Sequence, residues 1–398
     1  MKKKLLAAAV AAATLPAAYA VDMQAGDWTV TVGGNVNAFY TSSECKQPTG
    51  TVGGLAIGDA ALACGGKSKT TVIGNGLLPS MLNVGAKSTQ DGYDVSALIG
   101  IGVATATSSS VGQNNVVDVR NAYFTFGNKD MGTFKFGRDY GLFGLNAVLS
   151  DMTLLGVGAA TKATQDGRVS LGHLASGYTY AGTYGQMVYT SPSMGGFSVD
   201  AGVFNPVDTT LGVAANTASS NPALQARATF AGQGFKAWIG FKSQDFDPIA
   251  ATSATSATPT ALATLATPGV SGFKMNASEI GASFNAGPFG LIANYQTGNG
   301  VGMLSDADQG DIKGKNTFVQ ATYKVTDRVK LGLGVGKSEN DTNPGNGLLS
   351  NENTTAAVYF KLTKSLTLVG EVGTTTSKSF AGAEAKQNSY SVGGIFFF

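Results

Sequence analysis

YSVGGIFFF, residues 390–398, ends the chain and is the clearest sign of its fold. The large apolar side chains that share one parity there alternate with serine and glycine; they are Tyr390, Val392, Phe396 and Phe398. A period of two gives an extended strand one apolar face and one small or polar face. The stretch therefore predicts a β-strand that presents aromatic and aliphatic groups on one side only.

The same alternation recurs along the whole chain. Each alternating segment is of the order of ten residues, the length that a tilted strand needs to cross a membrane. We count sixteen such segments, at residues 28–41, 80–89, 93–105, 115–127, 132–138, 183–191, 196–205, 223–231, 234–243, 276–286, 288–297, 315–325, 327–337, 353–363, 365–375 and 388–398.

The connections between these segments alternate between short and long. Seven have at most four residues, and the long ones cover 42–79, 106–114, 139–182, 206–222, 244–275, 298–314, 338–352 and 376–387. Bacterial outer-membrane barrels have short periplasmic turns, longer external loops and an even number of strands. A soluble two-sheet sandwich would not produce this asymmetry. The sequence predicts an all-β protein, a sixteen-stranded antiparallel transmembrane β-barrel with both termini at the periplasmic side.

The first twenty residues have the features of a secretory signal peptide. Three lysines precede an apolar run from Leu5 to Leu15, and Ala18-Tyr19-Ala20 forms a cleavage site with small residues. The run is too short for a membrane-spanning helix, which needs about 20 residues. We therefore expect cleavage between Ala20 and Val21, leaving residues 21–398 as one barrel domain.

Composition argues against several functional classes. Without the three leader lysines the chain has 24 basic and 25 acidic side chains, so no strong positive field favours nucleic acid. His173 is the only histidine, and no Gly-x-Ser-x-Gly motif occurs. A catalytic pair or a histidine-rich metal site would have to be built around that one residue. We expect no enzyme activity, no cofactor and no metal site.

Cys45 and Cys64 are the only cysteines, and both lie in one polar, glycine-rich segment. An exported chain meets an oxidising compartment, which favours a disulfide across the first external loop. Two free thiols are the alternative. Zinc is disfavoured because no partner ligands cluster nearby.

Two motifs resemble the general porins of Gram-negative bacteria. DVRNAYFTFGNKDMGTFKFGRDYGLFG (118–144) is similar to the strand, turn and strand that lead into the third external loop of that family, and TYGQMVYTSPSMGGF (183–197) to a later turn. With the strand count, the resemblance covers essentially the whole mature chain, and it looks closest to porins of beta-proteobacterial type.

The resemblance implies a homotrimer in the Gram-negative outer membrane, in contact with its lipid and lipopolysaccharide. Each barrel would hold a water-filled pore narrowed by an infolded third external loop, residues 139–182. The aromatic end, Tyr390, Phe396 and Phe398, looks like the signal that the barrel-assembly machinery recognises.

The family's motif positions at the pore constriction indicate candidate residues in this chain. Arg120 matches a basic position and Asp151 an acidic one. Thr153-Leu154-Leu155-Gly156 then departs from the segment that carries a further acid in many members, so Asp139 or Asp166 is a candidate replacement. Arg138 has the parity of lipid-facing residues, where charge is costly, and we expect a bulge or turn to redirect it towards the pore.

The parity of the strands predicts which charges face the lumen. Ten bases share that face with five acids: Lys87, Arg120, Lys135, Arg227, Lys236, Lys242, Lys324, Arg328, Lys330 and Lys361 against Asp94, Asp118, Asp200, Glu279 and Glu371. The third loop adds Asp139, Asp151 and Asp166, partly offset by Lys162 and Arg168. Charged linings set channel selectivity, so the pore should favour anions weakly.

We expect a passive diffusion channel for small hydrophilic solutes and ions. A substrate-preferring anion channel of the same fold and a barrel that acts mainly as an adhesin or phage receptor are the alternatives. Two lumen-facing aromatic candidates, Trp238 and Tyr359, are too few for a sugar-binding slide.

Overall fold

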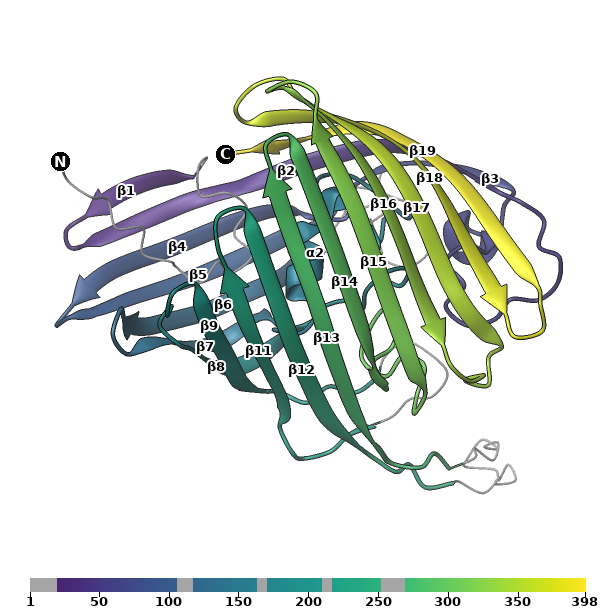
Figure 1. The fold of residues 1–398 in the computed structure, drawn as a ribbon, viewed down its shortest axis with the longest axis horizontal. Coiled ribbons are helices and arrows are strands. Elements are labelled where there is room, and N and C mark those ends of the chain that lie inside the picture. Colours follow the sequence, from purple (N-terminus) through teal and green to yellow (C-terminus); the bar gives the residue numbers. More distant parts are fainter. Residues whose placement is uncertain (1–19, 106–116, 163–169, 210–216, 252–268) are drawn as a thin grey trace, which may run out of the picture.

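The computed structural model describes residues 20–105, 117–162, 170–209, 217–251 and 269–398. Its main feature is one antiparallel sheet that closes on itself, because β19 pairs with β2 and β9 pairs with β11 (Figure 1). Sixteen strands form the ring: β2 (Trp28–Cys45), β4 (Ser80–Gln90), β5 (Tyr93–Val103), β6 (Val117–Asn128), β7 (Gly132–Tyr140), β8 (Thr183–Thr190), β9 (Phe197–Phe204), β11 (Ala223–Ala231), β12 (Phe235–Asp247), β13 (Phe273–Ala286), β14 (Phe289–Asn299), β15 (Lys313–Lys324), β16 (Val329–Asn340), β17 (Leu348–Lys361), β18 (Leu366–Ser379) and β19 (Glu384–Phe397). The predicted sixteen-stranded barrel is confirmed.

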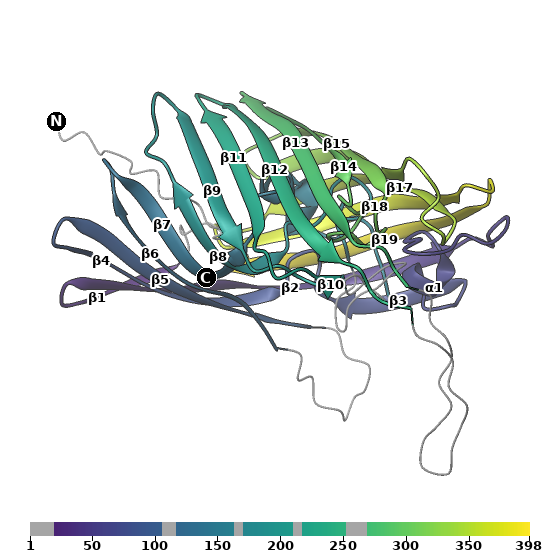
Figure 2. The ribbon, with the colours of Figure 1, turned by 90° about the horizontal axis from the view of Figure 1, so that it is seen from below.

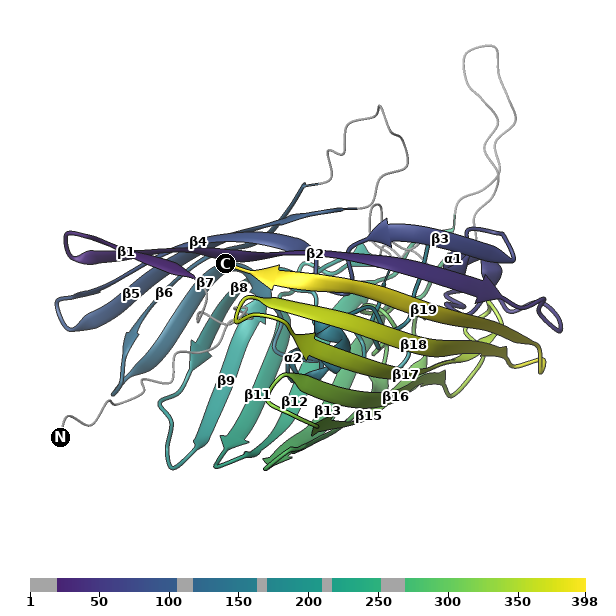
Figure 3. The same cartoon turned by 90° about the horizontal axis from the view of Figure 1, so that it is seen from above.

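Three short strands extend this ring and were not predicted: β1 (Val21–Ala25), β3 (Lys69–Gly74) and β10 (Thr217–Ala218). β1 pairs with the first residues of β2, directly beyond the point where β19 ends. The Gly34 N–H donates to the Phe398 carbonyl at 2.8 Å, and the Phe398 N–H donates back at 3.1 Å. Figure 3 shows β1 beginning beside the end of β19, so the two ends of the barrel meet along β2.

The two faces of the barrel wall differ as the alternation requires. On β14 the side chains of Leu291 and Tyr295 are exposed on the outer face, while Ile292, Asn294 and Gln296 are buried on the inner one. Large apolar side chains cover an outer surface only where hydrocarbon surrounds it. Among the described residues, no helix is long and apolar enough to cross a membrane.

Several strands continue past their predicted ends on the side of the long loops. On the outer face of β15, Val319 is followed by Thr317 and then Lys315. Lys315 pairs with Glu339 of β16 at 2.9 Å, and β16 pairs onward with Glu352 of β17. These outward positions are polar because they lie beyond the apolar belt. A search for apolar alternation therefore ended these strands early.

Several long connections contact the inner face of the sheet. Residues 141–182 contain α2 (Leu145–Ser150) and the 3-10 helix η1 (Met152–Leu155), and α1 (Ala60–Ala63) lies in the first long connection. α2 lies on the inner side of the sheet, where Asn146 accepts a hydrogen bond from Lys236 of β12 (Figure 2). One buried apolar cluster joins three connections; it includes Val52, Ile57, Leu145, Leu171, Tyr178, Met303 and Leu304.

Candidate functional site

Inward-facing polar side chains hold the outgoing half of the 141–182 segment against the wall. Glu279 of β13 accepts the Gly144 N–H at 3.0 Å, and Gln320 of β15 accepts the Met152 N–H at 2.6 Å. Glu371 of β18 accepts the N–H groups of residues 157 and 158, each at 2.8 Å. Buried backbone N–H groups need such acceptors, so these strand residues fix the path of the segment.

The returning half is held in the same way. The Thr179 N–H donates to Gln296 of β14 at 2.9 Å, and the Gly177 N–H donates to Ser338 of β16 at 3.1 Å. The outgoing half of the segment thus follows the wall from β13 to β18, and the returning half contacts β16 and then β14. On the other side of the barrel, Arg120 of β6 also contacts the segment.

Arg120 points inward on β6 beside a register shift. Gly100 of β5 faces Asn121, while the next residue of β5 faces Val119, which leaves Arg120 as the extra residue of a bulge. Its guanidinium lies 2.5 Å from the Asp118 carboxylate and donates to the Tyr180 hydroxyl at 3.2 Å. Tyr180 belongs to the 141–182 segment, so Arg120 links that segment to the wall.

Asp139 is buried on the inner face at the end of β7. Its carboxylate lies 2.5 Å from the Lys135 ammonium and accepts a hydrogen bond from Asn121 at 2.7 Å. The charge is therefore matched within the wall. Asp166 and Arg168, the other predicted third-loop charges, lie outside the described residues.

Asp151 does not face the lumen, and its predicted place at the constriction is wrong. Its side chain is 0% exposed and lies 3.0 Å from His173 Nδ1. It also accepts hydrogen bonds from the Tyr178 hydroxyl at 2.6 Å and the Thr153 N–H at 2.8 Å. The carboxylate joins the two halves of the segment, and solvent ions cannot reach it.

The electrostatics of this buried group, Asp151 with His173 and Tyr178, fit a structural role. Burial raises the pKa of the Asp151 carboxyl, but His173 and the hydrogen-bond donors outweigh burial and hold that pKa below its usual range. Burial and the nearby carboxylate raise the pKa of Tyr178 well above its usual range, so the hydroxyl remains a donor.

Arg138 is also not redirected inward, which corrects the second prediction. It keeps the outward parity of β7 and is exposed, with Nε donating to the Val119 carbonyl at 3.2 Å and Nη2 to Thr183 at 2.9 Å. The bulge that the sequence analysis assigned to this region occurs on β6 at Arg120 instead. Arg138 therefore cannot line the pore.

The exposed part of residues 145–160 contains no carboxylate. Its partly exposed side chains are Leu149, Ser150, Leu154 and Leu155, while the rest of the two short helices is buried. The departure from the family motif therefore places leucines where many members have an acid. Burial of Asp151 removes the other candidate.

A second connection also reaches inward, which sequence reasoning missed. Asp306, between β14 and β15, lies 2.5 Å from Lys242 of β12 and accepts a hydrogen bond from Tyr184 of β8 at 2.8 Å. All three side chains are buried. Asp308 accepts the N–H groups of residues 303–305 and so gives this connection a compact shape.

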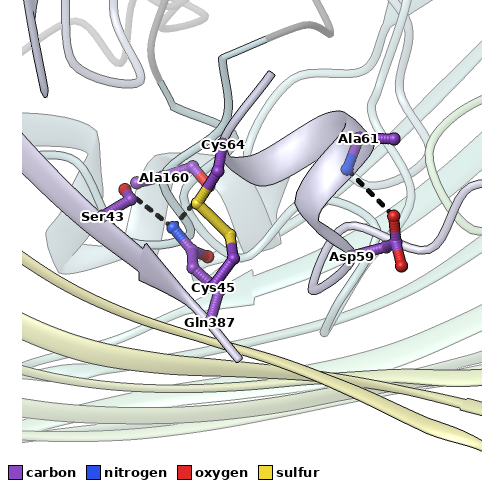
Figure 4. Close-up of a disulfide and its surroundings, with 7 residues drawn as sticks. All are labelled: Ser43, Cys45, Asp59, Ala61, Cys64, Ala160 and Gln387. Atoms are coloured by element: carbon purple, nitrogen blue, oxygen red, sulfur yellow. Dashed lines mark hydrogen bonds between the residues drawn. A yellow bond between two sulfur atoms is a disulfide. The ribbon is translucent and has the colours of Figure 1, made fainter. Parts of the chain in front are cut away.

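The first connection is fixed by the predicted disulfide. Cys45 and Cys64 are bonded, with their Cα atoms 6.4 Å apart, and Cys45 is the last residue of β2 (Figure 4). Beside it, Gln387 of β19 donates to Ser43 at 2.9 Å and to the Ala160 carbonyl at 3.1 Å. The bond thus ties the loop to the wall, close to the end of the 141–182 segment.

Five of the ten predicted lumen bases lie in ion pairs with acids. Lys87 lies 4.0 Å from Asp22, and the other four pairs are Arg120 with Asp118, Lys135 with Asp139, Arg227 with Asp200 and Lys242 with Asp306. In the described part of the chain, no ion pair involves Lys236, Lys324, Lys330 or Lys361. These four lysines have inward parity near the short turns.

A family model described as Gram-negative porin matches residues 6–380, nearly the whole chain. The chain belongs to the Gram-negative porin family. It is therefore a passive diffusion channel of the outer membrane, as the sequence predicted. No significant match was found among curated protein sequences.

Solved outer-membrane structures share the fold of this porin at low identity. The outer membrane channel DcaP of Acinetobacter baumannii matches with a TM-score of 0.66 and 13% identity, covering 94% of this chain and 99% of that chain. An anion-selective porin from Comamonas acidovorans matches with a TM-score of 0.62 and 16% identity, covering 93% and 100%. OmpF of Salmonella typhi, in complex with daunomycin, matches with a TM-score of 0.59 and 12% identity, covering 95% of this chain and 100% of that chain.

Proposed function

We propose that this porin passes small hydrophilic solutes between the 141–182 segment and the wall formed by β4 to β9. The observation that carries the proposal is the line of hydrogen bonds from Glu279 to Glu371, which holds the segment against the other wall. A sixteen-stranded barrel is too wide for wall side chains alone to fill. The segment then narrows the channel without closing it.

We propose a weak preference for anions. The charge pairs in the lumen cancel locally, and the lysines without ion-pair partners remain. No carboxylate of residues 145–160 is exposed to oppose them. Arg120 is balanced by Asp118, so replacing this arginine with an acid would leave two carboxylates unopposed beside the segment.

Planar-bilayer recordings test both statements. An open diffusion channel should give large steps of current that rise linearly with voltage. Steps that small sugars block at micromolar concentration would instead indicate a substrate-preferring channel. Complete absence of steps from correctly assembled barrels would reject the channel.

We further propose that the barrels form homotrimers through the face around Arg138. An outward arginine near the bilayer midplane costs about 2–4 kcal/mol in lipid, and none of the described carboxylates pairs with it. Within residues 93–105 and 117–128, the outer face of β5 and β6 carries no charged collar like that of β15 to β18. OmpT of Vibrio cholerae, which shares the fold (TM-score 0.56, 15% identity), has a solved trimer form.

Native electrophoresis of Arg138→Asp tests this interface. The substitution should shift the protein from trimer to monomer, while Lys274→Glu, which changes an exposed lysine of β13, should leave the trimer intact. An intact Arg138→Asp trimer would exclude this face.

The subgroup, the leader and the assembly partners remain predictions. We propose that residues 1–20 are removed between Ala20 and Val21, and that amino-terminal sequencing of the outer-membrane protein will begin at Val21. Contact with lipopolysaccharide and with the assembly machinery is part of the same proposal.

A further inference from the structure

The surroundings of η1 combine two chemistries. Leu154 and Leu155 are partly exposed, although the rest of η1 is buried. Lysines with inward parity lie on the neighbouring wall. They are Lys324 of β15, Lys330 of β16 and Lys361 of β17.

The geometry places the lysines next to the helix. Lys330 faces Lys324 across β15 and β16, and it faces Tyr359 across β16 and β17. Gly332, the next inward residue of β16 after Lys330, is so close to η1 that an added Cβ would collide with the Met152 sulfur. Lys330 is therefore the inward-facing residue next to the helix contact at Gly332, on the side of the short turn that precedes β16.

Tyr359 connects the two chemistries directly. Its hydroxyl donates to the Met152 carbonyl at 2.9 Å, and its ring centroid lies 4.7 Å from the Lys330 ammonium. Leu155 packs against the apolar cluster that contains both Met152 and Tyr359. Tyr359 is therefore in contact with both the apolar cluster of η1 and the Lys330 ammonium.

The charge of the lysines is not matched by the wall. Like charges that face each other across strands repel, and none of the described carboxylates forms an ion pair with any of the three. Glu371 is the acid nearest to Tyr359, but its oxygens accept the N–H groups of residues 157 and 158 and the Tyr359 hydroxyl. A bound anion would relieve the repulsion.

We propose that this surface is a binding subsite for amphiphilic anions, meaning carboxylates that carry a short apolar chain or ring. The carboxylate contacts Lys330 with Lys361 or Lys324, and the apolar part covers Leu154 and Leu155. The subsite rests on the channel function proposed above, because a solute crossing the barrel passes it. Its consequence is a channel that retains and conducts such anions better than equally charged polar ones.

Calorimetric titration of the detergent-solubilised trimer with three small probes tests the subsite. Hexanoate has both features, acetate only the charge and hexanamide only the chain. Each methylene that is fully buried strengthens binding about fourfold, so partial burial of the hexanoate chain should still give about tenfold tighter binding than acetate. Hexanamide should bind more weakly than hexanoate by a similar factor, since it lacks the charge.

Variants assign the binding to the named residues. The double variant Lys330→Gln/Lys361→Gln should bind hexanoate about tenfold more weakly. The double variant Leu154→Asn/Leu155→Asn should bind hexanoate no more tightly than acetate. Lys313→Gln, which removes an outward lysine of β15, is the matched control and should change nothing. The elution volume and thermal midpoint of each variant confirm that it is folded.

Equal affinities for hexanoate and acetate in the unmodified protein would overturn the proposal. An equal loss in the Lys313→Gln control would overturn it as well. Because titration does not require current, these results are independent of the KCl conductance that tests the channel itself. Binding of hexanoate without conductance would reject the channel but retain the subsite. Conductance without any effect of the apolar chain on binding would reject the subsite but retain the channel.

Discussion

The Lys242 ammonium lies 2.5 Å from the Asp306 carboxylate, and the Tyr184 hydroxyl donates to that carboxylate at 2.8 Å. This contact joins the connection between β14 and β15 to β12 and β8. The 141–182 segment depends on the same connection, since the Tyr180 N–H donates to the Leu304 carbonyl at 3.0 Å. Two connections therefore shape the lumen together.

Asp306→Asn should loosen this arrangement. It leaves Lys242 buried without a counter-charge, and breaking a buried ion pair in this way costs about 3–5 kcal/mol. We expect larger and noisier single-channel currents as the connection leaves the lumen. Asp341→Asn removes an ion pair at the exposed collar and is the control. Identical currents in both variants would show that Asp306 does not shape the channel.

The buried group of Asp151, His173 and Tyr178 predicts a specific dependence on pH. Because the folded-state pKa of Asp151 is depressed, its stabilising effect is complete above the usual aspartate pKa of about 3.9 and is lost as the pH falls through the lower, folded value. Protonation of Asp151 should therefore change the conductance only below about pH 4. An unchanged conductance between about pH 4 and pH 2 would contradict this assignment.

Asp151→Asn separates a structural role from a role in selectivity. The side chain is fully buried, so ion selectivity should stay the same while current noise increases at every pH. A shift of selectivity towards anions in this variant would mean that the carboxylate does reach the pore.

Deletion of Phe398 should reduce assembly without altering the conductance of the barrels that form. The deletion removes two hydrogen bonds to Gly34 and the last outward aromatic residue. Phe397 then ends the chain, but it is buried on the inner face and cannot replace an outward ring. Quantitative blotting of outer-membrane trimer, with Phe398→Tyr as the conservative control, measures the effect. Normal yield of the shortened chain would refute an assembly role.

Cys45 and Cys64 should resist alkylation until a reductant is added, as peptide mass spectrometry can show. Replacing both by serine should cost about 2–4 kcal/mol, and faster proteolysis of residues 46–68 should report it, because the bond fixes that loop to β2. Full alkylation without reductant would exclude the bond.

Much of the fold follows from the sequence because a membrane barrel has a simple pattern. Outward residues must be apolar where lipid surrounds them, so alternation located all sixteen strands. The pattern weakens at Glu339 and Glu352, beyond the apolar belt, and there the predicted strands were shorter than the observed ones. β1 and β3 have only five and six residues, fewer than a strand needs to cross a membrane, and were missed for that reason.

The constriction could be predicted only in part, because alternation gives the face of a residue but not its partners. Parity placed Arg120 inward and Arg138 outward, and the structure agrees with both faces; the expected redirection of Arg138 was the error. Asp151 was taken from a family position, and no sequence pattern reveals that His173 and Tyr178 enclose it. The inward position of Asp306 could not be predicted, because its ion-pair partner Lys242 is distant in sequence.

The reversal potential in a KCl gradient, measured for the unmodified protein and for Arg120→Glu, tests the account most directly. We predict an open channel whose reversal potential has the sign of chloride preference, and a shift towards potassium in Arg120→Glu. Lys313→Glu, which changes the same charge on the outer face, should not shift it. Potassium preference in the unmodified channel, or an unchanged potential in Arg120→Glu, would contradict the proposed lumen.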